Sequence, residues 1–215
     1  MKLHLALSVV AVALACGCEG PGAGKPAAEV GSAAGAATAS AAPAAARVEH
    51  LRFGPDTSKI GFVAAKVSMK HDGGFGAFAG TLDFQPDHPE ASRLSIDIET
   101  ASVWTDTDHL TEHLKTGDFF DVAAFPHATF ASTAIAPPAA PGGPWTITGD
   151  LALHGVTKSI RFPASVTIAP GEVHAASEFS LQRKDFGILY PGAPDDLVND
   201  DVLIKLDIRA ARPPG

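Results

Sequence analysis

Three residues near the middle of the chain have types and spacing that suit zinc chemistry. His109, Glu112 and His113 form an H-x-x-E-H pattern, in which two histidines share one face of a helix. Such a pair could bind Zn²⁺ through ring nitrogens, with Glu112 as a general base. The pattern needs a third ligand on a further helix, and the sequence predicts only one helix. A zinc-dependent enzyme is therefore an alternative hypothesis, and a coincidental match is the preferred interpretation.

Two further polar groups have structural interpretations. His154 precedes Gly155 at an expected turn, and the chain has no G-x-S-x-G elbow that could supply a nucleophile. We interpret His154 as a ring that caps a turn carbonyl. The aspartates at 195–196 and 200–201 lack the D-x-D-x-D-G spacing of a calcium loop, so a solvated loop is the preferred interpretation.

Large aromatic side chains gather in an irregular stretch over residues 113–130. Pro126 stops a helix from continuing there, because it lacks a backbone donor. The aromatic members are Phe119, Phe120, Phe125 and Phe130. Side chains this apolar must pack against a dry surface. The sequence therefore predicts that the stretch packs on the protein's own core, lines a ligand chamber, or does both.

The elements that must position these residues are mostly β-strands. Apolar and polar residues alternate with period two from residue 48 onward, as in Leu94–Glu99 and Asp201–Arg209. This alternation predicts antiparallel sheet with one dry face and one wet face. Further strands are expected at 59–69, 74–84, 128–135, 145–154, 159–162 and 178–182, with breaks at 71–74, 86–90, 137–144 and 170–171.

Only residues 107–116 are expected to be helical. They follow Asp106, a candidate N-cap, and end at Gly117, a suitable C′ residue. About eight or nine strands with one short helix predict an all-β domain, either a closed antiparallel barrel or a sandwich. An eight-stranded barrel can be filled by side chains or can hold one small ligand.

Small residues occupy many of the expected strand positions. They would leave a lumen if they faced inward, whereas the alternative places them outside or at tight bends. The positions are Ala64, Ala65, Gly76, Ala77, Ala79, Gly80, Ala131, Ala152, Ala175 and Ala176.

The N-terminal region is expected to be an export signal and a tether. Residues 1–15 contain an apolar run of signal-peptide length, followed by Cys16 and Cys18, either of which fits a lipidated cysteine. Cys16 is preferred, and a disulfide or stray thiols are the alternative. Residues 16–47 are mostly Ala, Gly, Ser and Pro, which predicts a flexible linker with a reach of about 30 Å. The barrel domain is expected at 48–212.

The charge of the chain excludes one class of partner. The 16 Lys and Arg against 24 Asp and Glu give a net charge of −8, and loss of Lys2 with the signal would leave 15 against 24, or −9. Nucleic acid binding needs a basic surface, so nucleic acid is not an expected partner.

Several short motifs follow one another along the chain. They are Ser58–Phe62, Phe75–Leu82, Ser95–Val103, His113–Leu114, Asp118–Val122, Phe125–Pro126, Thr129–Phe130, Thr148–Thr157 and Arg183–Gly187. In this order they resemble the YceI-like family of exported, lipocalin-like polyisoprenoid-binding proteins. Leu110 and Thr111 depart from the Arg-Asp that the family often has there, and Lys184 replaces a usually neutral residue. A polar bridge made by the Arg-Asp pair is therefore not carried over.

The resemblance implies an extended eight-stranded antiparallel barrel with one short helix in a loop. It implies non-catalytic binding or carriage of a polyisoprenoid, an isoprenoid quinone or another long amphiphile, with no required cofactor. The residues expected to line the lumen are Phe62, Phe75, Phe78, Trp104, His113, Phe119, Phe120, Phe130, Ile147, Leu151 and Leu153. A structural or partner-binding envelope domain with a self-filled barrel is the other alternative.

The expected location is the periplasm, as a membrane-anchored lipoprotein. Neither Gly17 nor Glu19 is the aspartate that typically retains a lipoprotein at the inner membrane, so the outer membrane is favoured. The sequence leaves the oligomeric state open, with a homodimer as one candidate.

Overall fold

The computed structural model describes residues 20–33 and 47–213, and most of them lie in β-strands. Cys16, Cys18, the expected signal and residues 34–46 lie outside the described part. The strands are β1 (Glu29–Ser32), β2 (Glu49–Phe53), β3 (Lys59–Lys66), β4 (Met69–Phe75), β5 (Phe78–Phe84), β6 (Arg93–Glu99), β7 (Val103–Thr105), β8 (His127–Ala136), β9 (Trp145–Leu153), β10 (Val156–Ala169), β11 (Glu172–Gln182), β12 (Gly192–Ala193), β13 (Asp196–Leu197) and β14 (Asp201–Ala211).

Short helical elements connect some of these strands. The α-helix of the described residues is α1, Asp108–Leu114, and three 3₁₀ turns are η1 (Pro89–Ala91), η2 (Thr100–Ser102) and η3 (Arg183–Phe186). Nowhere in residues 20–33 and 47–213 is a helix long and apolar enough to cross a membrane.

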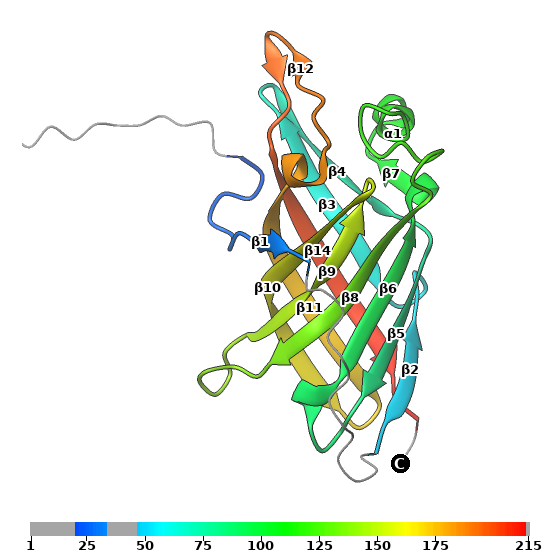
Figure 1. Cartoon of the computed structure of the whole chain (residues 1–215), viewed down its shortest axis with the longest axis vertical. Coiled ribbons are helices and arrows are strands. Elements are labelled where there is room, and N and C mark those ends of the chain that lie inside the picture. The colour runs from blue at the N-terminus through cyan, green and yellow to red at the C-terminus, as the bar shows by residue number, and fades with distance from the viewer. Residues whose placement is uncertain (1–19, 34–46, 214–215) are drawn as a thin grey trace, which may run out of the picture.

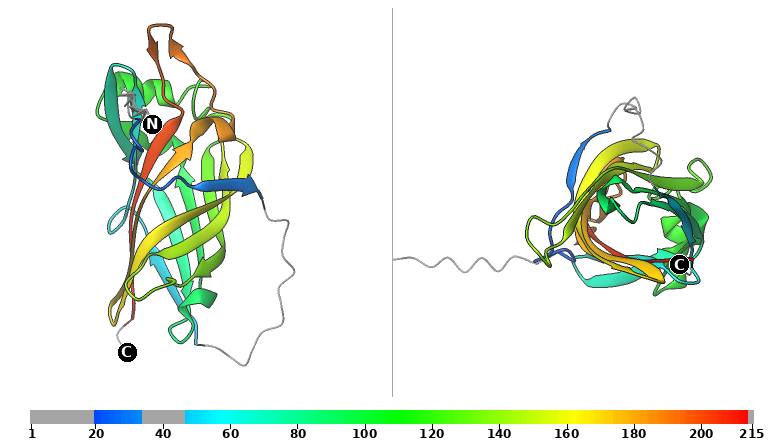
Figure 2. Two further views of the ribbon diagram at one scale, coloured as in Figure 1. Left: turned by 90° about the vertical axis from the view of Figure 1, so that its left-hand side faces the viewer. Right: turned by 90° about the horizontal axis from the view of Figure 1, so that it is seen from below.

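One curled antiparallel sheet forms the body of the molecule. Its strand order is β2-β5-β6-β8-β9-β10-β11-β14-β3-β4-β7, and β1 pairs with β10 beside this path. Figure 1 shows the elongated curl from the side, and the view from below in Figure 2 shows the strands surrounding an interior. The β12–β13 hairpin and α1 lie at one end of the curl. The prediction of an all-β, antiparallel, barrel-like fold with one helix is confirmed.

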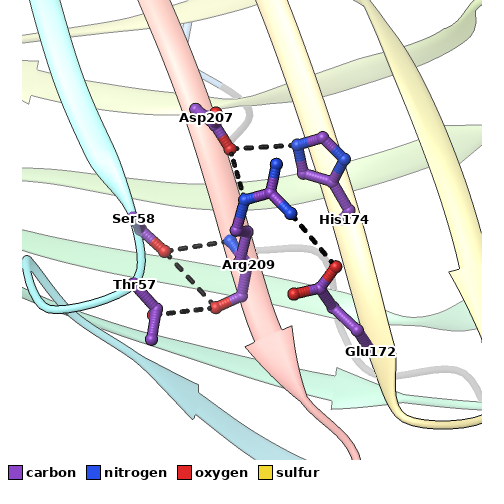
Figure 3. Close-up of polar contacts among 6 residues, drawn as sticks. All are labelled: Thr57, Ser58, Glu172, His174, Asp207 and Arg209. Carbon is purple, nitrogen blue, oxygen red and sulfur yellow. Dashed lines mark hydrogen bonds and ion pairs between the residues drawn. The ribbon is translucent and has the colours of Figure 1, made fainter.

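Side chains rather than a strand ladder join β2 and the turn after it to β14. Ser58 accepts a hydrogen bond from the Arg209 backbone N–H at 2.9 Å, and Thr57 donates to the Arg209 carbonyl at 3.1 Å. Figure 3 shows that the Arg209 guanidinium also contacts Asp207 and Glu172, while His174 contacts Asp207. Arg212, directly after β14, pairs with Glu49 in β2. These contacts hold the two sides of the curl together.

The alternating pattern buries one face of several strands. In β11, for example, Phe179 and Leu181 are buried, and Glu178 and Gln182 are exposed. The main buried cluster runs along the interior, and a second cluster lies below α1. The second cluster consists of Phe62, Val103, Leu114, Phe119 and Ile188.

One expected strand and one expected break are wrong. Residues 59–69 do not form one strand, because the chain turns at 67–68 and returns as β4. Residues 71–74 therefore lie inside β4 instead of forming a break, and Gly73 and Gly74 pair with Phe62 and Gly61 of β3. Glycine tolerates a strand position when neighbouring side chains occupy the space that its missing Cβ leaves. The Phe62 ring occupies that space at Gly73, where an added Cβ would lie 2.5 Å from it.

The helix is shorter than expected, and its cap differs. Thr107 is the N-cap of α1, without a side-chain capping bond. Asp106 does not cap the helix, because its carboxylate is 2.8 Å from the His71 ring in β4. Lys115 ends the helix in a right-handed conformation, so Gly117 is not a left-handed C′ residue. The left-handed turn falls at Asp121, with φ of 43°.

Part of the expected flexible linker is attached to the barrel. β1 pairs with β10 in register from Glu29 opposite Arg161 to Ser32 opposite Lys158. Val30 packs against the main buried cluster. In Figure 2 the segment crosses the outside of the barrel wall. The prediction of a flexible tether is therefore wrong for residues 20–33, because backbone bonds to β10 and β11 and the packing of Ala28 and Val30 attach this segment to the barrel.

Candidate functional site

The interior of the curl contains an elongated apolar chamber. Its volume is about 270 Å³, slightly below the roughly 300–1,000 Å³ typical of small-molecule sites. The lining comes from strands on all sides and from both ends of the barrel. Ser92, Ser177 and Arg183 are the polar residues of that lining, and the rest are apolar. A chamber of this kind suits a hydrocarbon chain better than a polar metabolite.

Stacked aromatic side chains form the middle of the chamber wall. The Phe162 and Phe179 rings stack at 4.3 Å between centroids, and Phe130 lies 5.9 Å from Phe162. These rings come from β8, β10 and β11, whose alternation points them inward. Gly149 in β9 leaves room for Phe130, because an added Cβ would lie 2.4 Å from the ring. The aromatic wall therefore depends on a glycine in the neighbouring strand.

The α1 end of the chamber is covered by the Phe-rich stretch. Leu114, Phe119 and Phe120 all line the chamber from this cover. Phe120 makes an edge contact with Phe75 at 5.6 Å. The turn beyond it is held by a hydrogen bond of 2.8 Å from the Phe125 N–H to the Asp121 carbonyl. The stretch is thus both core and chamber lining, as one of the sequence interpretations allowed.

A buried arginine lies at the same end of the chamber. The Arg183 guanidinium donates to the carbonyls of Ile188, Asn199 and Val198 at 2.7, 3.0 and 3.3 Å, and it contacts Asp200 at 3.1 Å. Burial lowers the pKa of Arg183, and the nearby Asp200 opposes that shift. Its donors bind the backbone on both sides of the β12–β13 hairpin. Arg183 therefore fixes residues 188–200 over this end of the barrel.

Most of the residues expected to line the lumen do line the chamber, whereas three do not. The expected residues in the lining are Phe62, Phe75, Phe119, Phe120, Phe130, Ile147, Leu151 and Leu153. Phe78 is buried in the main cluster without reaching the chamber. Trp104 and His113 lie elsewhere.

Trp104 points away from the interior, so its placement in the lumen is wrong. Its neighbour Val103 is 3 % exposed and Trp104 is 49 % exposed, because successive residues of β7 face opposite sides. The indole instead lies over Gly74 on the outer face, where an added Cβ would be 3.0 Å from the ring.

His113 packs behind the chamber wall and does not line it. Its ring makes edge contacts with Phe119 and Tyr190, both at 5.0 Å, and its Nε2 is 2.9 Å from Asp118. His113 therefore orients the Phe119 side chain, which does reach the chamber. The expectation that His113 itself lines the lumen is wrong, because its ring is held between Phe119, Tyr190 and Asp118.

The zinc pattern does not assemble a metal site in the described residues. His109 is exposed, His113 is paired with Asp118, and Glu112 is 2.7 Å from Lys115. Over 20–33 and 47–213, no group of three or more His, Cys, Asp or Glu is arranged to hold a metal ion. The third ligand that the pattern requires is thus not found in this part of the chain.

The structure shows the contacts of His154 and of the aspartates in the acidic loop. The His154 ring contacts the Phe186 carbonyl at 3.2 Å, which confirms the turn-capping interpretation. The aspartates are not simply solvated. Asp196 is paired with Lys66, and that hydrogen bond lowers the Asp196 pKa, while Asp200 is paired with Arg183 and Lys184. The acidic loop is thus attached to the barrel by ion pairs.

Several chamber residues were not identified from the sequence. The alternation of their strands was the available signal, since inward positions share one phase. They include Phe53, Phe84, Leu94, Ile96, Trp145, Phe162, Phe179 and Ile204. Arg183 had a different signal, because it lies in the late motif Arg183–Gly187.

The sequence matches one family model and several known relatives. The model of the YceI-like domain family matches residues 51–210. A UPF0312 protein of Pseudomonas putida (strain W619) is 34% identical over 140 residues, covering 62% of this chain and 71% of that relative. A UPF0312 protein of Pseudomonas syringae pv. tomato is 35% identical over 139 residues, with the same shares covered.

Solved structures with this fold include three bacterial proteins. BcnA of Burkholderia cenocepacia superposes with a TM-score of 0.64 at 24% identity, over 72% of this chain and 96% of that chain. A polyisoprenoid binding domain from Saccharophagus degradans, implicated in plant cell wall breakdown, has a TM-score of 0.60 at 16% identity, over 78% and 100%. The YCEI protein of Campylobacter jejuni has a TM-score of 0.58 at 24% identity, over 66% and 84%.

Proposed function

Since the chain belongs to the YceI-like domain family, we propose that it binds and carries an isoprenoid or another long amphiphilic lipid in its chamber, without chemical conversion. The observation that carries this proposal is the lining of the chamber, in which Ser92, Ser177 and Arg183 are the polar members. Each CH₂ buried in such a lining contributes about 0.8 kcal/mol. A long hydrocarbon chain therefore needs few polar contacts to bind tightly.

The similar Saccharophagus degradans domain is described as polyisoprenoid binding, and this supports the same ligand class for the present chamber. The rings of Phe119, Phe120 and Phe130 provide flat apolar surfaces along which a branched chain can lie. A quinone head group or another polar end would lie near one of the polar residues of the lining, Ser92, Ser177 or Arg183. Both the isoprenoid chain and the quinone remain part of the proposal.

We also propose that the protein works at the bacterial envelope. The apolar run before Cys16 and Cys18 suits export and acylation, which would attach the protein to a membrane facing the periplasm, with the outer membrane favoured. A carrier attached in this way would load and release its lipid without leaving the envelope. A single acyl chain binds a membrane only reversibly, so stable attachment to the membrane takes a second anchoring signal.

The test is to extract natively purified protein with organic solvent and to identify the lipids by mass spectrometry. Phe120→Asp places a charge in the cover of the chamber and is expected to remove the lipid and to weaken folding, because an unpaired charge is costly in an apolar site. Trp104→Asp is the matched control, since Trp104 is an aromatic residue on the outer face. Lys184→Ala should keep both the lipid and the fold, because Lys184 is half exposed outside the lining.

The outcomes separate the candidate functions. A long-chain lipid in wild type and Trp104→Asp but not in Phe120→Asp supports carriage. An equal lipid load in Phe120→Asp contradicts the assignment of the Phe-rich cover to the binding site. Wild-type protein that yields no lipid favours a structural or partner-binding role. Stoichiometric zinc in protein purified without added metal would favour the zinc-dependent alternative.

A further inference from the structure

The N-terminal segment closes a gap in the barrel wall. β10 and β11 pair only from Ser165 to Ala169 of β10, and nearer its start β10 pairs with β1 instead. On the other side, the Ala28 N–H donates to the Ser180 carbonyl in β11 at 2.8 Å, and the Ser180 N–H donates to the Pro26 carbonyl at 2.9 Å. Residues 26–32, which we call the seam segment, therefore bridge β10 and β11.

Side chains on both strands reinforce the seam segment. Lys25 forms an ion pair with Glu178, and this contact lowers the Glu178 pKa. Glu29 lies 3.3 Å from Arg161. Farther back along the chain, Gly22 packs so closely on Ser180 that an added Cβ would lie 2.8 Å from its side chain. The contacts on β11 thus continue N-terminally beyond the seam segment.

The chain leaves the barrel at one particular place. Gly20 lies beside Asn199 and Asp201, where an added Cβ would be 3.5 Å from the Asn199 side chain. This position is at the base of the β12–β13 hairpin, at the end of the barrel that also carries α1 (Figures 1 and 2). Gly20 is two residues from Cys18 and four from Cys16. An extended chain of that length spans at most about 7 or 14 Å.

Exposed apolar side chains gather at the same end. Four of them form what we call the tip surface: Val67, Met69, Leu189 and Leu197, which are 61, 49, 62 and 50 % exposed. The Val67 N–H donates to the Leu197 carbonyl at 3.1 Å, so the β3–β4 turn and the β12–β13 hairpin are in contact. Among the described residues, Val48 and Ile168 are the large exposed apolar residues near the opposite end.

The tip surface also adjoins the end of the chamber. Ile188 and Val198 line the chamber, and their chain neighbours Leu189 and Leu197 are exposed on the tip surface. The residues between 188 and 198 therefore separate the chamber from the outside at this end. A lipid surface in contact with the tip would lie directly outside the chamber.

We propose that the tip surface lies on a lipid bilayer, held there by an acyl chain on Cys16 or Cys18. This inference rests on the proposed lipid carriage and acylation, and it adds the orientation of the barrel and the end at which lipid enters. The short span from Gly20 to either cysteine leaves the tip, rather than the far end, within reach of the membrane. Near the tip, Asp196 is paired with Lys66, and Asp200 is paired with Arg183 and Lys184, so these charges offset one another. We therefore assign the contact with the bilayer to the apolar side chains and the anchor.

The experiment uses the acylated full chain in neutral phosphatidylcholine vesicles that contain brominated lipid. Trp104 and Trp145, the two tryptophans of the chain, are replaced by Phe, and a single tryptophan is then introduced by Leu197→Trp or by Val48→Trp. The two sites are matched, since both are exposed apolar residues outside the chamber lining, at opposite ends of the barrel. We expect bromolipid to quench Leu197→Trp fluorescence at least several-fold more strongly than Val48→Trp fluorescence. Anionic lipid should not strengthen the quenching.

A second variant tests the seam segment. Ala28→Pro with Val30→Asp removes the donor to Ser180 and puts a charge where Val30 packs, so the segment should detach and lengthen the tether. Flotation with vesicles should persist, and quenching of Leu197→Trp should fall by at least half. Gly31→Ala is the control, because an added Cβ there meets nothing within 4 Å.

Each outcome decides a different part of the proposal. Equal quenching at both sites, or none at either while the protein floats with vesicles, overturns docking by the tip. Protein that does not float and carries no acyl group on its N-terminal peptide overturns the anchor. Lipid extracted from the chamber is measured on the same sample, so lipid carriage can stand or fail separately. Unchanged quenching in the seam variant overturns the orienting role of residues 26–32.

Discussion

The Arg212 guanidinium binds both carboxylate oxygens of Glu49, with Nε 2.8 Å from Oε2 and Nη2 3.0 Å from Oε1. The pair joins β2, where the barrel begins, to the residue after β14, where it ends. Arg212 also donates to the Ala169 carbonyl at 2.8 Å and lies 4.9 Å above the Phe84 ring. The Arg212 side chain therefore connects β2, β5 and β10 at the end of the barrel opposite α1.

Acid should weaken this connection. The hydrogen bond from Arg212 lowers the pKa of Glu49 below its usual range. A carboxyl whose pKa is lowered by folding stabilises the protein above its unfolded pKa, and that stabilisation is lost as pH falls through the folded pKa. We expect Glu49→Gln to lower the thermal midpoint by several degrees at pH 7 and to approach wild type at pH 3, as measured by circular dichroism. Asp56→Asn, at an exposed turn, is the control, and a constant difference across this range would contradict the role of Glu49.

A glycine in the barrel wall should not tolerate a methyl group. An added Cβ at Gly80 would lie 2.0 Å from the Phe53 ring, which lines the chamber. Overpacking of a core costs roughly 1–3 kcal/mol, so Gly80→Ala should lower the free energy of unfolding by about that amount in urea titration. Gly171→Ala should be nearly neutral, because nothing lies within 4 Å of its added Cβ. Equal stability of the two variants would show that Phe53 moves freely.

The loop at the tip should depend on Arg183. Arg183→Met leaves the carbonyls of Ile188, Asn199 and Val198 without their donor, at a cost of roughly 1–3 kcal/mol for buried groups. We expect faster amide hydrogen exchange over residues 187–200 and little change over β9. Lys184→Ala removes the neighbouring exposed contact with Asp200 and should leave exchange in the loop near wild type. Unchanged exchange in Arg183→Met would mean that other contacts hold the loop.

The sequence predicted the sheet where local pattern is sufficient to define it. In β6 and β14, the alternation of Leu94–Glu99 and Asp201–Arg209 predicted the strand and the face that lines the chamber, although Leu203 on the other face of β14 is buried as well. The aromatic crowding at 113–130 likewise indicated a covered apolar surface, and Phe119 and Phe120 do lie in the chamber lining. These features depend on neighbours in the chain, which the sequence displays directly.

Other features depend on contacts between distant residues. β1 is four residues long, and its partner Arg161 is far along the chain from Glu29, so composition alone suggested a tether. Val30 is the one large aliphatic residue of that region, and together with Ala28 it packs on the core. β7 has only three residues, which are too few to show an alternating apolar and polar pattern. The sequence therefore did not indicate that Val103 faces inward and Trp104 faces outward.

Glycines in the strands were ambiguous for a similar reason. Gly80 suggested empty space inside the barrel, and the ring of Phe53 occupies that space, just as the ring of Phe130 occupies the space beside Gly149. Ala64 and Ala175 do border the chamber, so small residues mark the lumen at some positions and close aromatic packing at others. Whether a small residue borders the lumen or packs against a ring depends on the side chain that lies opposite it in the neighbouring strand. The register of the two strands determines that side chain.

The most direct test of lipid carriage is native mass spectrometry of the full chain purified without denaturation. The chamber predicts an intact mass that exceeds the denatured mass by one long-chain lipid, lost when the barrel unfolds and absent in Phe120→Asp. A covalent acyl group would remain in both measurements and so would not be mistaken for the bound lipid. A native mass equal to the denatured mass, with an empty organic extract, would contradict the account.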